Sequence, residues 1–103
     1  MKRFCDKMDE NNGFIMIQRK KNIRTLKSLG IQLRTVKGII RTLKVRHYCS
    51  GPEPDENSNE NLWIFGYEFN QKMIYIKLSD DFEFRAKCVS FHFPDYPMKF
   101  PYN

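Results

Sequence analysis

The chain has 103 residues, the size of one domain spanning 1–103, and 41% of them are hydrophobic, which is enough for a modest core. No apolar run approaches the ~18 residues of a membrane span. The charged N-terminus lacks the apolar stretch of a secretory signal, so we expect a cytoplasmic protein. Three cysteines without a C-x-x-C pair argue against a disulfide framework and a metal site, and no cofactor motif is present.

The positive charge is concentrated in the first half of the chain. Residues 1–48 contain 13 Lys and Arg against three acidic residues, whereas residues 49–103 contain five against nine. A basic half of this kind favours a polyanionic partner, and RNA or DNA is the usual one. Composition leaves open the alternative of a solvated basic surface that serves solubility.

The first 30 residues predict a loose start and one short helix. Residues 1–12 are polar and charged, so we expect them to be flexible. The apolar run at 14–17 is compatible with a first strand or with the lead-in to a helix. Residues 22–30 are expected to be helical, because Asn22 is a good N-cap residue and Gly30 is typical of a helix end.

Residues 33–45 carry the strongest helical pattern in the chain. Apolar residues recur at helical spacing: Leu33, Val36, Ile40 and Leu43. A basic stripe follows one position later, formed by Arg34, Lys37, Arg41 and Lys44. A charged face is often merely solvated, but no acidic residue stands between Asn11 and Pro52. Such dense like charge predicts an acidic partner for this helix.

The second half of the chain changes to the period of a β-sheet. Residues 50–61 are polar turn formers and predict a loop. Strands are predicted at 62–69, 73–78 and 84–93, with turns at Asn70-Gln71 and at 79–83. The layout indicates an α+β fold with N-terminal helices on one face of a small antiparallel sheet. The proline-rich C-terminal tail, residues 94–103, is expected to be extended and packed on the domain.

Alternation along the last two strands places small or polar side chains on one face. They are Tyr75 and Lys77 on one strand, and Ala86, Cys88, Ser90 and His92 on the other. We expect Tyr75 to lie opposite a residue between 87 and 91. His92 then lies one or two residues further along the same face.

This set of side chains suits cleavage of an RNA backbone. A histidine can take or give a proton near neutral pH, and Lys77 can stabilise negative charge on a phosphate. Tyr75 can orient the phosphate or move a proton. The alternatives are structural: a partly buried Tyr75, a solvated Lys77, and a His92 that is hydrogen-bonded to the tail at the end of its strand.

Five groups of residues, taken in order, resemble one protein family. They are RKKNIRTLKSLGI, YCSGPEPD, LWIFGYE, YIKL and CVSFHFPDYPMKFPY. Together they resemble the MqsR-like toxins of bacterial type II toxin–antitoxin systems, over residues 14–103. The resemblance implies a RelE-like toxin fold and a metal-independent endoribonuclease that cleaves mRNA. It implies an antitoxin partner, often one with a zinc-binding segment and a helix-turn-helix. The alternative is a non-catalytic RNA- or protein-binding module derived from such a toxin.

The resemblance also assigns residues and marks departures from the family pattern. Tyr75 matches the family's active-site tyrosine, and His92 stands where the better-known members have a lysine. Ile64 replaces a glutamine, and Cys49 replaces a lysine. The predicted catalytic residues are His92, Tyr75 and Lys77, with Arg46, His47 or Arg85 as substitutes for the missing groups. The predicted RNA-binding residues are Arg34, Lys37, Arg41, Lys44, Arg46, Arg85 and Tyr48.

Overall fold

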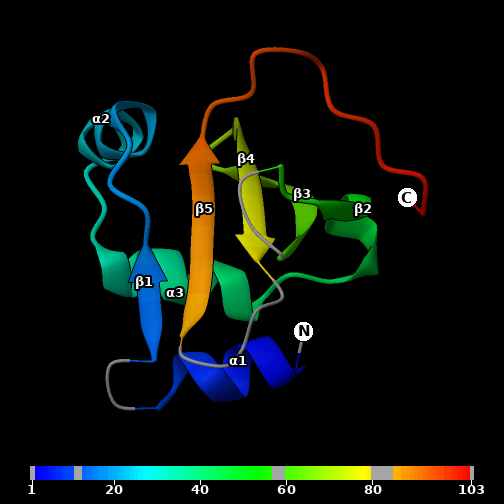
Figure 1. Cartoon of the computed structure of the whole chain (residues 1–103). Helices are drawn as coiled ribbons and strands as arrows, with labels where there is room; N and C mark the ends of the chain where they lie inside the picture. The colour runs from blue at the N-terminus through cyan, green and yellow to red at the C-terminus, as the bar shows by residue number, and fades with distance from the viewer. Residues whose placement is uncertain (1, 11–12, 57–59, 80–84, 103) are drawn as a thin grey trace.

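The computed structural model describes residues 2–10, 13–56, 60–79 and 85–102, which contain three α-helices, one short 3-10 helix and five strands. In chain order they are α1 (Lys2–Met8), β1 (Phe14–Met16), α2 (Lys20–Leu29), α3 (Leu33–Arg41), η1 (Val45–His47), β2 (Tyr48–Pro54), β3 (Asn61–Phe69), β4 (Lys72–Ser79) and β5 (Ala86–His92). Figure 1 shows the helices gathered beside one sheet. Within the described residues, no helix has the length and apolarity needed to cross a membrane.

The strands form one sheet in the order β1-β5-β4-β3-β2. Strands β2 to β5 are antiparallel neighbours, whereas β1 runs parallel to β5, so the sheet is mixed at one edge. The α+β class is confirmed. The turn at Asn70-Gln71 is confirmed as well, because both residues have the positive φ that a tight hairpin requires. The second predicted turn, at 79–83, lies outside the described residues beyond Ser79.

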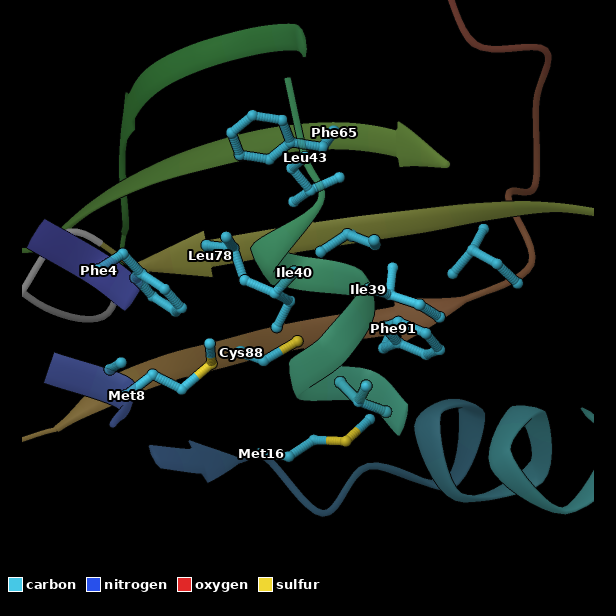
Figure 2. Close-up of a cluster of buried hydrophobic side chains, with 14 residues drawn as sticks. Phe4, Met8, Met16, Ile39, Ile40, Leu43, Phe65, Leu78, Cys88 and Phe91 are labelled. Atoms are coloured by element: carbon cyan, nitrogen blue, oxygen red, sulfur yellow. The ribbon is translucent and has the colours of Figure 1, made fainter. Parts of the chain in front are cut away.

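The predicted flexible start of the chain instead contains a helix. Phe4 and Met8 of α1 are buried, 3% and 0% exposed. They are four residues apart and therefore lie on the same side of the helix. Figure 2 shows both side chains entering the core beside Cys88 and Leu78. Two apolar residues among many charged ones give only a weak helical pattern in the sequence. The burial of Phe4 and Met8 nevertheless attaches α1 to the domain.

Asn22 does not cap a helix, which corrects the sequence prediction. Helix α2 begins at Lys20, after Arg19, and Asn22 is buried inside it. Its side-chain amide donates to the carbonyls of Ile17 and Val89, and its Oδ1 accepts from the N–H of Phe91. Strand β1 ends at Met16, so Asn22 continues the pairing of β5 where β1 stops. Gly30 ends α2 in the left-handed conformation, as predicted.

Helix α3 covers one face of the sheet with the apolar stripe that the sequence indicated. Val36, Ile39 and Ile40 are buried. Figure 2 shows Ile39 beside Phe91 of β5 and Ile40 beside Leu78 of β4. The helix ends at Arg41 and not at residue 45. The Thr42 hydroxyl donates to the carbonyl of Ile39 at this point, a local bond that competes with further helix. Leu33, at the first turn, is exposed.

The predicted loop at 50–61 is partly strand. Residues Tyr48–Pro54 form β2, which pairs with β3 through two register shifts and contains a cis Gly51–Pro52 peptide. Proline and glycine suppress the strand signal, but an edge strand tolerates both because it needs ladder hydrogen bonds on only one side.

The C-terminal tail lies on the sheet face opposite α3. Figure 1 shows the tail leaving the end of β5 and running toward β2. Gly66 of β3 has no side chain, and the Phe100 ring and the Met98 sulfur occupy the space where a Cβ would stand. At the far end, the Tyr102 ring lies 5.5 Å from the Tyr48 ring. The sheet is therefore covered by α1 and α3 on one face and by the tail on the other.

Candidate active site

The register of β4 and β5 places two predicted catalytic residues directly opposite each other. Tyr75 pairs with His92, and Lys77 pairs with Ser90. The Tyr75 and His92 rings are stacked, with centroids 5.2 Å apart and an angle of 11° between their planes. Lys77 Nζ lies 5.7 Å from the centre of the Tyr75 ring. The four side chains come together on the face that the tail partly covers.

A β-bulge corrects two details of the predicted site. The register shifts between Lys77 and Leu78, so Leu78 pairs with Cys88 and Val89 is the extra residue. Cys88 therefore points into the core and not to the face of His92. The same shift explains why Tyr75 lies opposite residue 92, outside the expected range of 87 to 91.

The side chains of Tyr75, Lys77, Ser90 and His92 form one wall of a cleft with a volume of about 430 Å³. The start of α2 and the C-terminal tail form the other walls. The lining residues are Arg19, Lys21, Cys49, Ser50, Ile64, Tyr75, Lys77, Ser90, His92, Pro94, Asp95, Tyr96, Pro97, Met98 and Lys99. Among the described residues, no group of three or more His, Cys, Asp or Glu side chains is placed to hold a metal ion.

The orientation of the His92 ring favours the role of a base. Nδ1 lies 3.0 Å from the carbonyl oxygen of Phe93. A carbonyl only accepts, so Nδ1 carries the hydrogen in this contact, and the neutral ring has its lone pair on Nε2. Stacking on Tyr75 holds the plane of the ring. A half-buried imidazole with a defined tautomer is suited to proton transfer in the cleft.

The cleft is more basic than the sequence analysis anticipated. Besides Lys77, it is lined by Arg19, Lys21 and Lys99. The acidic group in the cleft, Asp95, accepts a hydrogen bond from Lys21 Nζ at 2.7 Å. This bond, reinforced by the charge of Lys21, lowers the pKa of Asp95 below its ordinary value, and His92 adds a smaller attraction. Lys99 lies far from Arg19 and Lys21 in sequence, so no local motif could have indicated that the three side chains meet.

Comparison with known proteins identifies the family of the chain. The sequence profile described as "Motility quorum-sensing regulator, toxin of MqsA" matches residues 4–93. The chain belongs to this family. No curated protein and no solved structure matches the chain significantly. The predicted resemblance is confirmed, and membership implies a RelE-like fold and a toxin of a toxin–antitoxin system with an antitoxin partner.

The two departures from the family pattern both lie in the cleft. Ile64 of β3 pairs with Lys77, and Cys49 of β2 lies at the rim beside Ser50. Burial raises the pKa of the Cys49 thiol, against a weaker opposing effect of a hydrogen bond with the Gly66 backbone. The thiol is therefore neutral at physiological pH and does not replace the positive charge of a lysine. Arg46, His47 and Arg85, the predicted substitutes, do not line this cleft.

The predicted RNA-binding residues lie in several places outside the cleft. Arg34 and Lys37 line a second hollow on α3 with Leu33 and Met8, on the other side of the sheet. Arg41 forms an ion pair with Asp9. Lys44, Arg46 and Arg85 are exposed, and Arg85 precedes β5 at the end opposite His92. Tyr48 packs against the rings of Trp63 and Phe65. Contact of these residues with RNA or with an antitoxin stays a prediction.

Proposed function

We propose that the chain is a metal-independent endoribonuclease toxin that cleaves mRNA in the cytoplasm. The observation that carries the proposal is the stacked pair of Tyr75 and His92 in a cleft lined by basic side chains. Membership in the toxin family supports the same conclusion. The active site is assigned to side chains of β4 and β5, with basic side chains from α2 and the tail around them.

In the proposed reaction, Nε2 of His92 takes the proton of a ribose 2′-hydroxyl. The 2′-oxygen attacks the neighbouring phosphorus, and the bond from phosphorus to the 5′-oxygen breaks. The Tyr75 hydroxyl gives its proton to the leaving 5′-oxygen. Proton exchange with water then restores both side chains. The products are a 2′,3′-cyclic phosphate and a 5′-hydroxyl, so the atoms balance without an added reactant.

Lys77 is assigned to the charge that builds up on the phosphate. It lies beside Tyr75 on the same strand face, and a cation held in a partly enclosed cleft stabilises a charged transition state more than one in bulk water. Arg19 and Lys99 at the walls are assigned to phosphates on either side of the cut bond. They supply positive charge in place of the lysine that the family pattern has at the position of Cys49.

The proposed partners are mRNA and a cognate antitoxin. The family description names a toxin of MqsA, and the antitoxin is proposed to carry a zinc-binding segment and a helix-turn-helix. Its acidic groups are proposed to meet the basic residues of α3, including Arg34 and Lys37. An antitoxin bound at α3 would leave the cleft free to bind RNA.

The proposal is tested with purified chain, an RNA transcript and an excess of metal chelator. We expect cleavage that leaves a 2′,3′-cyclic phosphate on the upstream fragment and a 5′-hydroxyl on the downstream fragment. Cleavage that appears only when a divalent cation is restored would overturn metal independence. An intact transcript would overturn the nuclease assignment.

A second function, a non-catalytic binding module, is favoured by the cleft position of Ile64 and Cys49. An isoleucine neither donates nor accepts a proton, and Cys49 is neutral. This function predicts that the chain retards RNA in a gel with steep salt dependence. It also predicts that no cut ends appear, and the transcript experiment therefore separates the two functions.

A further inference from the structure

The ring of Tyr96 is too exposed to contribute to packing. Its exposed fraction is 81%, the highest among the large apolar side chains of the described residues. It nevertheless lines the same cleft as Tyr75 and His92. An exposed aromatic ring at the rim of a basic cleft is the arrangement that proteins use to stack an unpaired nucleic-acid base.

The backbone that presents Tyr96 is held on both sides. The preceding residue, Asp95, pairs with Lys21 of α2 at 2.7 Å. Two residues further on, Met98 lies against Gly66, and so does Phe100. Pro94 and Pro97 restrict the chain between these anchors. The ring is thus offered from a preorganised segment, which lowers the entropy lost when a ligand binds.

We propose that Tyr96 stacks a base of single-stranded RNA next to the phosphate that is cut. The inference rests on the proposed nuclease function and adds a residue that positions the RNA strand by stacking on one of its bases. A paired base has its faces covered by its neighbours in the helix, so it cannot reach the ring without unstacking. Lys99 and Arg19, on the walls of the same cleft, hold the backbone of the same strand.

An exposed tyrosine is also a common anchor in protein interfaces. RNA is favoured over a protein partner because Tyr96 shares its cleft with Lys77 and His92, and the four basic side chains there outnumber Asp95. A strand that carries a negative charge at every nucleotide fits this lining better than a mixed protein surface does. A protein interface is therefore one outcome of the test.

The test measures binding of a short, labelled, single-stranded oligomer with 2′-O-methyl groups, which block cleavage. Tyr96→Ala is expected to weaken the Kd about 5- to 150-fold, the usual range for loss of one stacked base. Tyr96→Phe and Tyr96→Trp should stay close to the parent because they keep an aromatic face. The Trp variant has a second tryptophan in addition to Trp63, and the oligomer should quench the fluorescence of the new ring.

The matched control is Tyr102→Ala. Tyr102 is in the same tail and is also exposed, at 65%, but it does not line the cleft. Its loss should leave the Kd within about twofold of the parent because no base stacks there. The duplex form of the oligomer should bind parent and Tyr96→Ala alike.

The outcomes separate this inference from the proposed function. If the parent cuts RNA and Tyr96→Ala binds the oligomer as tightly as the parent, the stacking role is overturned and the nuclease stands. If Tyr96→Ala loses only antitoxin binding, the ring belongs to a protein interface and the inference is likewise overturned. A parent that neither binds the oligomer nor cuts RNA overturns both.

Discussion

At the scale of single residues, the position of one bulge decides what the candidate site contains. Val89 is the extra residue, so Cys88 joins the core while Ser90 and His92 face the cleft. Simple alternation along β5 would put all three on one side. Val89 is an ordinary strand residue, so the sequence offers no sign of the bulge. The predicted catalytic trio is nevertheless brought together.

The burial of Cys88 predicts a specific dependence of stability on pH. Burial raises the pKa of its thiol from 9.0 to about 12. Between these values the unfolded chain loses the proton and the folded chain keeps it, so stability falls as pH rises. We expect the parent to lose up to about 1.4 kcal/mol more per pH unit in this window than Cys88→Ala.

Urea unfolding of both chains under reducing conditions measures this difference. The small cavity left by the alanine side chain adds a destabilisation of its own, but this contribution does not change with pH. Parallel stability curves for parent and variant above about pH 9 would show that the thiol is not linked to folding in this way.

At the scale of elements, the tail and β3 fit together at Gly66. A Cβ at this position would lie 2.6 Å from Phe100 Cζ and 3.0 Å from the Met98 sulfur. Gly66→Ala should therefore push the tail off the sheet at a cost of about 1–3 kcal/mol. It should also speed tryptic cleavage after Lys99 and weaken RNA cleavage, because the tail forms a wall of the cleft.

Gly38 provides the matched control for this element. It lies inside α3, and an added Cβ would meet nothing within 4 Å. Gly38→Ala should raise the stability by about 0.5–1 kcal/mol through helix propensity and leave the tail protected. Equal protease resistance of the tail in Gly66→Ala and the parent would contradict the fit described for β3 and the tail.

The elements differ in how far the sequence could predict them. Gly30 and Asn70-Gln71 mark a helix end and a hairpin by backbone conformation, so local signals suffice. Helix α1 depends on two buried residues, Phe4 and Met8, which have partners only in the folded core. Asn22 looks like a cap in sequence, and its role in β5 pairing arises from contacts 67 and 69 residues away.

At the scale of the whole molecule, basic groups lie on two opposite faces. One set, Arg19 and Lys99, lines the cleft, and the other, Arg34 and Lys37, lies on α3 behind the sheet. The helical period indicated the second set, whereas the first is assembled by the fold from distant segments. Net charge alone could not tell which face meets RNA.

Replacing each pair by alanine distinguishes the faces. For a single strand, each phosphate contact contributes about 0.7 to the slope of log K against log salt. The cleft variant Arg19→Ala/Lys99→Ala should lower that slope by roughly 1 to 1.5 and weaken binding. Arg34→Ala/Lys37→Ala should leave the slope unchanged. The reverse result would place RNA on α3, as the basic stripe of the sequence first suggested.

Comparing the two histidines of the chain tests whether His92 transfers the proton in RNA cleavage. His47 is the control: it accepts a hydrogen bond from the Lys44 N–H, lies outside the cleft, and has a pKa lowered first by burial and then by Arg46 and Lys44. The measurement is the rate of RNA cleavage by purified His92→Ala and His47→Ala, with matching circular dichroism spectra. We expect a loss of about 10²- to 10⁴-fold for His92→Ala, together with loss of growth inhibition, and near-parental activity for His47→Ala. A His92→Ala protein that folds normally and cuts RNA at the parental rate would contradict it.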